Sequence, residues 1–395
     1  MKTVLLVVAG AADRPVAELG GRTPLEAAAT PRLDRLAREA RVGQVVPAPE
    51  GLRPEEGAFA LGLLGLDARQ HADLGATMDA AAMDVPVGSL DQAFRLSLVT
   101  ADRETLHDPC AGHIRRDEAV LLLDALAEAC RAQDLLLVPG PAGRGLMVWR
   151  GARDVRVQTV PPTEVVGRSL RAALPRGTGI GHLLQLIDRS RELFAAHEVN
   201  ELRRDLGENP ATLVWPWGPG VVQPLVSLRE RLGLSGGFVG AEPCMRGLAR
   251  LLGMELATVE GATGLPGTDL VGKARAACRL LASHDLVVVH VDCVAATSRT
   301  RDFVAKVGAL ERVDAELVTP LVEHLEGLPG TRLLVVGGEA ISVETGRHLT
   351  DPVPFALWES GKPWPGRGAF SEVGTLEGGI EVSEAHQLLE LAFKM

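Results

Sequence analysis

The chain has 395 residues, of which 46% are hydrophobic and 23% are charged, a composition typical of a folded globular protein rather than a disordered one. Its formal net charge of -10 argues against a broad basic face for nucleic acid or for an anionic membrane. A chain of this length exceeds what one hydrophobic core usually fills, so we expect two folded units.

The N-terminal region and the cysteines indicate a cytoplasmic protein. The apolar stretch before Gly10 is too short for a secretory signal, and no segment approaches the length of a membrane-spanning helix. The five cysteines are odd in number and form no close pair, which argues against a disulfide framework or a zinc site. We therefore expect reduced thiols and no membrane partner.

Continuous aliphatic runs alternate with helical patterns along most of the chain. Residues 4–8 are typical of a strand that is buried on both faces of a parallel sheet, and Thr30 is placed to cap a helix that begins at Pro31. Further strands are expected at 213–215, 238–239, 286–290 and 333–336, and further helices at 243–252, 270–283 and 302–326. This alternation predicts an α/β fold with a doubly wound sheet.

A different pattern occupies residues 85–180. A helix at 116–131 is surrounded by strand candidates at 93–99, 135–138 and 145–149, and proline-rich linkers follow near 161 and 175. We predict a core formed by residues 1–84 and 181–395, interrupted by an inserted α+β lid domain of residues 85–180.

Local motifs by themselves identify no function. The glycine-rich stretches at 235–237 and 261–264 lack the spacing of a dinucleotide fingerprint, and turns explain them better. The sequence contains no nucleophile elbow, no Walker loop and no local cluster of metal-ligand residues.

Over its full length, however, the chain resembles the archaeal type of cofactor-independent phosphoglycerate mutase, within the alkaline phosphatase superfamily. The resemblance is carried by ordered segments at 18–26, 49–51, 64–67, 93–95, 111–114, 209–211, 217–220, 261–264 and 351–355. It implies an alkaline-phosphatase-like α/β core with an inserted lid. In that family two divalent metal ions, typically manganese or a similar ion, activate a serine that transfers the phosphoryl group.

The residues that this chemistry requires are mostly replaced. The first aspartate ligand of the family corresponds to Ala9, and only the non-ligand Asp13 remains of that motif. Glu56 stands at the position of the serine. A later aspartate and histidine correspond to Ala295 and Arg299, and an Asp-His pair corresponds to Gly338-Glu339. His348 is the one ligand position named here that is retained, and one imidazole cannot hold a divalent ion, so we expect no metal cofactor.

The lid side is only partly changed. An arginine and a histidine expected near the substrate correspond to Gly75 and Thr163, whereas Arg95, Asp108, His113 and Lys273 are retained. His113 is either an anion-binding residue or a histidine that a local hydrogen bond holds in place. Cys110 and Cys293 lie near former site segments, but buried, unreactive thiols are the better interpretation.

The substitutions at the metal site compensate one another in charge. Two glutamates, Glu56 and Glu339, would face Arg299 where the family has aspartates that face metal ions. If such a pair is buried, removing one partner should strongly lower the stability of the protein. Arg203 is expected to be exposed, so its removal should cost less than that of Arg299.

These observations predict a metal-independent relative of the mutases without phosphomutase chemistry. We expect a small carboxylated or phosphorylated metabolite to bind between core and lid through Arg95, His113 and Lys273. An enzyme repurposed for a metal-free reaction is an alternative, with Glu56, Glu339, Arg299 and His113 as candidate catalytic groups. A subunit that binds a protein partner or a second copy, and whose cleft is vestigial, is another.

Overall fold

The computed structural model describes residues 2–52, 57–130, 134–140, 143–366 and 368–393, and the chain divides into two compact units. Unit 1 comprises Met1–Ala72 and Leu225–Met395, and unit 2 comprises Asp73–Pro224. Unit 2 therefore interrupts unit 1 in the chain. Among the described residues, no helix combines the length and the apolar character that crossing a bilayer requires.

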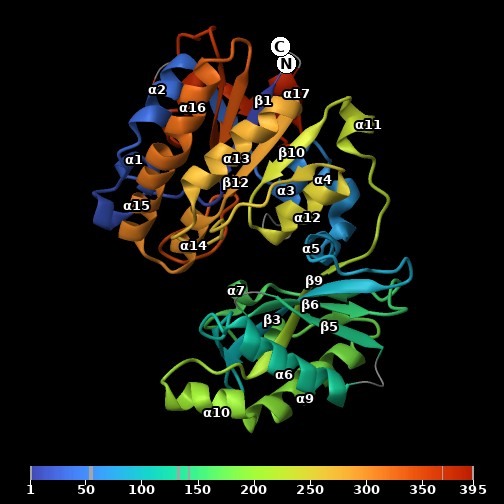
Figure 1. The fold of residues 1–395 in the computed structure, drawn as a ribbon. Coiled ribbons are helices and arrows are strands. Elements are labelled where there is room, and N and C mark those ends of the chain that lie inside the picture. The colour runs from blue at the N-terminus through green and yellow to red at the C-terminus, as the bar shows by residue number, and fades with distance from the viewer. Residues whose placement is uncertain (1, 53–56, 131–133, 141–142, 367, 394–395) are drawn as a thin grey trace. The chain divides into compact units, whose positions relative to one another are not determined.

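Unit 1 is built on an eight-stranded sheet (Figure 1). Across the sheet the strands follow the order β11 (Glu255–Leu256), β10 (Gly236–Val239), β12 (Leu286–Val291), β1 (Thr3–Val8), β13 (Arg332–Val336), β14 (Val353–Glu359), β2 (Arg41–Val45) and β15 (Ile380–Val382). β14 pairs antiparallel with both of its neighbours, and the other pairs are parallel. The predicted α/β class is confirmed, with one reversed strand that the aliphatic pattern did not reveal.

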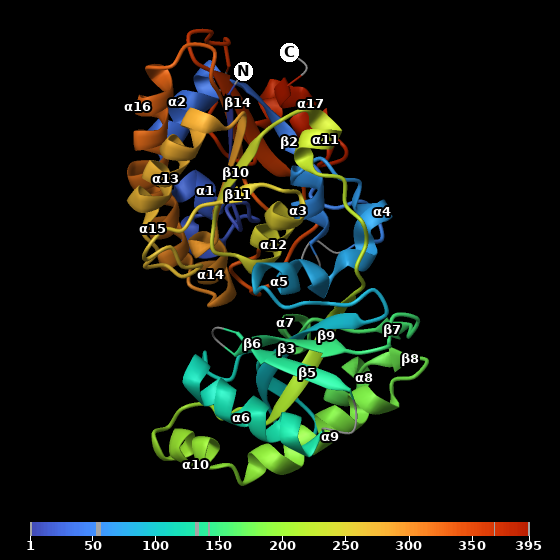
Figure 2. The same cartoon turned by 45° about the vertical axis from the view of Figure 1, so that its right-hand side comes forward.

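Helices cover both faces of this sheet (Figures 1 and 2). α2 (Pro31–Glu39), α13 (Leu270–Ser283), α15 (Phe303–Val313) and α16 (Thr319–Glu326) share one hydrophobic core with β1, β12 and β13. On the other side lie α3 (Ala58–Leu63), α12 (Pro243–Leu251) and α17 (Gln387–Phe393). Unit 1 also contains the helices α1 (Pro24–Ala27), α4 (Ala68–His71), α11 (Leu228–Leu232) and α14 (Cys293–Arg299).

The helix expected over 302–326 is interrupted. A π-helical segment, Asp314–Val318, separates α15 from α16. The Asp314 carboxylate accepts hydrogen bonds from the amides of Arg32 (3.1 Å) and Leu33 (2.7 Å), in the first turn of α2. Thr30 makes no side-chain capping bond. The cap of α2 therefore comes from a residue far along the chain, because Asp314 reaches the free amides that Thr30 was expected to satisfy.

Unit 2 contains a five-stranded antiparallel sheet. Four strands follow the order β4 (Leu106–Asp108), β3 (Gln92–Ala101), β6 (Arg144–Trp149) and β5 (Leu135–Pro139), and β9 (Leu213–Gly220) also pairs with β3. α6 (Arg116–Ala129) and α9 (Gly181–Ala195) pack their apolar faces into one core with β3, β5, β6 and β9. Shorter elements are β7 (Val157–Gln158), β8 (Arg176–Gly177), α7 (Pro162–Val165) and α8 (Leu170–Ala173).

The predicted boundaries of the inserted unit, 85 and 180, are too narrow. On the N-terminal side, α5 (Ala76–Ala82) buries Ala76 and Ala80 against β3 and β6. On the C-terminal side, α9, α10 (Glu198–Asp205) and β9 belong to this unit, and β9 pairs antiparallel with β3. The strand predicted at 213–215 therefore lies in the sheet of unit 2 rather than in the core sheet.

Candidate functional site

Three segments that correspond to metal-binding motifs of the mutases meet at the carboxyl ends of β1, β12 and β13. Their backbones are joined by hydrogen bonds from the Ala9 amide to the Val291 carbonyl (2.9 Å) and from the Gly10 amide to the Glu339 carbonyl (3.0 Å). Open α/β sheets bind ligands at this edge. A functional site of unit 1 is therefore expected at these strand ends.

The centre of this edge is apolar. Ala9, Ala295 and Ile341 form a small buried cluster, with exposed fractions of 2%, 1% and 0%. The packing is also close, because a Cβ atom on Gly338 would lie 2.4 Å from the Ala9 Cα, and one on Gly10 would lie 2.7 Å from the Ala295 Cα. The positions that correspond to aspartate ligands thus carry methyl groups or hydrogen, and little space separates them.

His348 lies beside this cluster and pairs with Ile341 in an isolated β-bridge. Its Nδ1 atom is buried and has no hydrogen-bond partner among the described residues. Burial, and then the positive charge of Arg299, lower the pKa of His348 to about 3. The imidazole is therefore neutral at physiological pH.

The residues present do not fit the two divalent ions that the family resemblance implies. Within the described parts of the chain, no group of three or more His, Cys, Asp or Glu side chains could hold a metal ion. Neutral His348 could donate one nitrogen, but tetrahedral and octahedral ions need several further ligands. Glu56 lies outside the described residues, and Glu339 is half-buried at the end of β13.

The expectation of a buried Arg299 is wrong. Arg299 is the last residue of α14 and is exposed, whereas Val294, Ala295 and Ser298 of the same helix are buried. α14 turns its small and apolar side toward the core, which leaves its C-terminal guanidinium at the surface. The charge of Arg299 still acts on the site, since it lowers the pKa values of both His348 and Asp292.

A buried polar cluster that the sequence analysis missed lies at the end of β12. Nδ1 of His290 is 3.3 Å from Oδ2 of Asp292, and the two residues are only 4% and 7% exposed. The ammonium group of Lys273, from α13, donates to the His290 carbonyl at 3.2 Å and is fully buried. The sequence does place His290 and Asp292 two positions apart at a strand end, which could have indicated this cluster. In the sequence analysis, His290 was counted only as part of the buried strand 286–290.

Burial and charge oppose each other in this cluster. Burial is the largest single influence and lowers the pKa of His290, but the Asp292 carboxylate, Glu242 and Glu339 together outweigh it, so the net pKa is raised. Burial raises the pKa of Asp292, and His290, Lys273 and Arg299 reverse this to give a lowered pKa. Burial lowers the pKa of Lys273. The cluster is a set of mutually compensating charges.

The opposite shifts of the two histidines can be measured in one titration by NMR of a histidine-labelled protein, with His290→Gln and His348→Gln to assign the signals. We expect His290 to lose its proton above its ordinary pKa of about 6.5, and His348 to stay neutral down to about pH 3. The stabilisation from protonated His290 should be complete below about pH 6.5 and should fall as the pH rises through its folded-state pKa. Two histidines titrating together near 6.5 would contradict the described geometry.

A second buried pair lies close to the apolar cluster. The Lys306 ammonium group donates to Oδ2 of Asp13 at 2.8 Å and to the Ile341 carbonyl at 2.9 Å. The Asp13 carboxylate also accepts from the amides of Val343 (2.9 Å) and Arg14 (2.7 Å). Both side chains are almost completely buried. This pair ties the loops after β1 and β13 to α15.

In unit 2, the two expected ligand-binding residues differ in their surroundings. Arg95, on β3, is 7% exposed, donates from Nε to Asp79 at 2.8 Å and lies 5.0 Å from the centre of the Trp217 ring. His113 follows β4 and is exposed. No hydrogen bond of its imidazole to another described residue is found, so the alternative of a histidine held by a local hydrogen bond gains no support.

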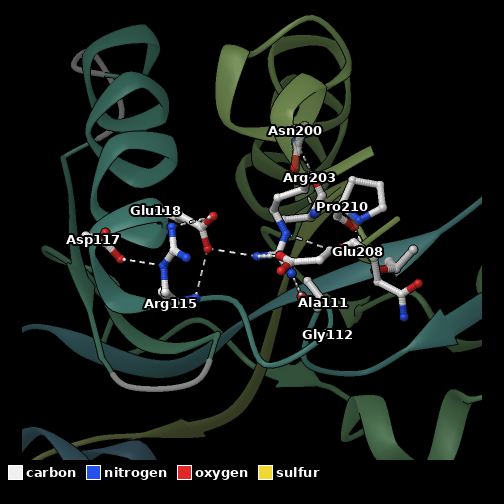
Figure 3. A network of polar contacts seen from close by, with 12 residues as sticks. Ala111, Gly112, Arg115, Asp117, Glu118, Asn200, Arg203, Glu208 and Pro210 are labelled. Carbon is white, nitrogen blue, oxygen red and sulfur yellow. Dashed lines mark hydrogen bonds and ion pairs between the residues drawn. The ribbon is translucent and has the colours of Figure 1, made fainter. Parts of the chain in front are cut away.

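Arg203 is buried, not exposed as expected. It is 2% exposed, and its Nη1 atom lies 2.8 Å from Glu118 and 2.9 Å from Glu208 (Figure 3). Val199 and Arg203, four positions apart on α10, face inward together.

The thiols of Cys110 and Cys293 have raised pKa values. Burial raises the pKa of Cys110 to about 12 and that of Cys293 to about 11, which is typical of unreactive thiols.

Comparison with known proteins identifies the family. A family model described as 2,3-bisphosphoglycerate-independent phosphoglycerate mutase matches residues 37–200. A protein of that name from Methanothrix thermoacetophila is 34% identical over 99% of each chain. The chain belongs to this mutase family. A probable mutase from Geobacter sulfurreducens is 33% identical, again over 99% of each chain.

Solved structures agree on the fold of this mutase-family chain. A protein from Pyrococcus horikoshii matches with a TM-score of 0.78 and 24% identity, covering 100% of this chain and 96% of that one. A cofactor-independent phosphoglycerate mutase from Thermoplasma acidophilum matches with a TM-score of 0.61 and 23% identity, covering 100% and 99%. The sequence relatives confirm the predicted family resemblance, and these structures confirm the fold.

Proposed function

We propose that this chain is a mutase-family protein without phosphomutase chemistry, which binds no metal at the family's positions and instead binds a small carboxylated or phosphorylated metabolite. The observation that carries the proposal is the closed apolar cluster of Ala9, Ala295 and Ile341. Manganese and similar divalent metal ions need oxygen, nitrogen or thiolate ligands, and the methyl groups of these side chains supply none. Transfer through a serine would further need that residue where the sequence has Glu56.

Two measurements test the catalytic half of the proposal. We expect elemental analysis, after dialysis against manganese, zinc or cobalt, to find no stoichiometric metal, and a coupled assay with 3-phosphoglycerate to find no mutase activity. The Methanothrix thermoacetophila relative, purified and assayed in parallel, is the positive control. About one tightly bound ion per chain together with turnover would overturn the proposal and would point to a new ligand set.

Positively charged and hydrogen-bonding side chains support the second part of the proposal, the binding of an anionic metabolite. Arg95, His113 and Lys273 are the proposed contacts, and charge-assisted hydrogen bonds to carboxylate or phosphate are strong in a partly desolvated site. Of the three, His113 is exposed, whereas Arg95 and Lys273 are buried. A ligand can therefore reach His113 most directly.

Thermal-shift screening with phosphorylated and carboxylated metabolites, in the presence of a chelator, tests this half. Stabilisation of the wild type that is lost in Arg95→Ala and His113→Ala would support anion binding. If no anion stabilises the wild type, a subunit that binds a protein partner or a second copy becomes the better proposal.

The buried pair of His290 and Asp292 favours one second candidate, an enzyme repurposed for a metal-free reaction. A carboxylate that orients an imidazole is a common arrangement for proton transfer. Turnover of a bound metabolite, abolished in His290→Gln, would favour this candidate over a binding protein.

A further inference from the structure

The loop between β4 and α6 adopts an uncommon backbone. Ala111, Gly112 and His113 have φ angles of 47°, 65° and 53°, so three consecutive residues are left-handed and two of them carry side chains. This conformation is unfavourable for residues other than glycine and persists only where surrounding contacts enforce it. The exposed imidazole of His113 stands at the end of this turn.

The Asp108 carboxylate holds the amide side of the loop. It accepts hydrogen bonds from the amides of Cys110 (2.9 Å) and Gly112 (2.7 Å) and from the side chain of Asn209 (2.7 Å). These bonds, which favour the ionised carboxyl, outweigh the effect of burial and lower the pKa of Asp108. The carboxylate therefore stays charged and bonded to the loop at neutral pH.

The guanidinium group of Arg203 holds the carbonyl side (Figure 3). Its Nη2 atom donates to the Ala111 carbonyl at 2.9 Å, and its Nε atom donates to the Asn209 carbonyl at 3.0 Å. A Cβ atom on Gly112 would lie 3.0 Å from Nη2, so the loop rests directly against the guanidinium. Arg203 thus contacts both the left-handed turn and the segment that bonds to Asp108.

Glu118 fixes the orientation of this guanidinium. Its Oε2 atom lies 2.8 Å from Nη1 of Arg203 and accepts from the Arg115 amide at 3.1 Å. Glu118 lies in the first turn of α6, the helix that follows the loop. An arginine fork bound at several atoms has a defined orientation, whereas the single ammonium of a lysine does not.

We infer that Arg203 and Glu118 are positioning residues, which keep residues 111–113 left-handed and thereby hold the His113 imidazole in place to contact an anion. The ligand part of this inference rests on the proposed function. A merely structural pair would stabilise unit 2 without affecting His113. A positioning pair also determines the environment of the imidazole and the affinity for an anion.

The test uses the full-length protein and two conservative variants, Arg203→Lys and Glu118→Gln. Arg203→Lys keeps the positive charge beside Glu118 but loses the fork to the Ala111 and Asn209 carbonyls. Glu118→Gln keeps the shape but removes the charge that orients Arg203. The matched control is Arg189→Lys, since Arg189 forms an exposed pair with Glu192 on α9.

The first readout, which needs no ligand, is the NMR resonance of the His113 ring in histidine-labelled protein, assigned with His113→Gln. We expect it to shift in Arg203→Lys and Glu118→Gln and to stay in place in Arg189→Lys. An unchanged His113 resonance in both folded variants would overturn the inference. If Arg203→Lys does not fold, Glu118→Gln alone decides.

The second readout is the affinity for inorganic phosphate in the presence of a chelator. We expect the dissociation constant to rise about tenfold in Arg203→Lys and to be unchanged in Arg189→Lys, which corresponds to one misplaced charge-assisted contact. Equal affinity in wild type and Arg203→Lys would overturn the inference even if the resonance moves. Absence of phosphate binding by the wild type, with the resonance shifted, would count against the proposed function and would leave the positioning role supported.

Discussion

Replacing Lys306 by methionine should lower the free energy of unfolding by about 3–5 kcal/mol, because it leaves the Asp13 carboxylate buried without its cation. The two side chains are 0% and 1% exposed, and 2.8 Å separates Nζ from Oδ2. The Ile341 carbonyl would lose its Lys306 donor as well. Urea-induced unfolding of wild type and variant measures the difference.

The control is Lys362→Met, because Lys362 pairs with Glu359 but is 72% exposed. Exposed pairs contribute about 0–1 kcal/mol, so this variant should remain close to the wild type. Adding Asp13→Asn to Lys306→Met should recover part of the loss, since the buried charge is then gone. Equal stability of the two lysine variants would mean that water reaches Asp13 and that the described burial is wrong.

The local hydrophobic pattern of the sequence was sufficient to predict the buried strands. It was not sufficient to predict contacts between segments far apart in the chain. The runs at 4–8, 286–290 and 333–336 are strands because every residue in them is apolar or buried. The break at Asp314–Val318 was not predicted, because the helical period of 302–326 continues through it. What distinguishes Asp314 is its bond to α2, about 280 residues away in the sequence.

The boundary of the inserted unit was predicted wrongly for the same reason, because it depends on contacts between distant segments. β9 follows two helices and is apolar, like a strand of the core sheet, yet its backbone pairs with β3. Antiparallel partners are determined by packing in three dimensions, and the pattern of one strand does not identify its neighbour.

The sequence indicated which residues stand at the family's ligand positions, but it did not indicate how these residues pack. Motif comparison placed Ala9, Ala295 and Gly338 at former ligand positions, but it could not show that Ile341 packs against Ala9 and Ala295. The compensating charges were sought in Arg299, which is exposed. Buried pairs of opposite charge are formed by His290 with Asp292 and by Lys306 with Asp13.

The burial of Arg203 was not predicted, because the average polarity of a helix does not show which of its charged residues faces inward. α10 carries mostly charged residues, so its inward face rests on few apolar side chains, Val199 among them. Only the position of Arg203 one turn after Val199 indicated its direction.

Gly338→Asp, which introduces the aspartate that the family resemblance implies at this position, should destabilise the protein instead of providing a metal ligand. A Cβ atom at this position would lie 2.4 Å from the Ala9 Cα and 2.6 Å from the Val8 carbonyl oxygen, both of them backbone atoms that cannot rotate away. Overpacking of this kind costs about 1–3 kcal/mol. The left-handed φ of 63° adds strain on the order of 1 kcal/mol for a residue with a side chain.

Gly330→Asp separates the two contributions. Gly330 also has a left-handed φ, 77°, but a Cβ atom there would meet nothing within 4 Å. In this control the free energy of unfolding should therefore fall only by the strain of the left-handed backbone. Chemical denaturation of both variants then gives the difference that is due to packing. Equal stability would mean that the ends of β1 and β13 can separate, and an aspartate could then enter the former site. The expected larger loss in Gly338→Asp would instead mean that the space for this ligand has closed, so that one reverse substitution cannot rebuild the metal site.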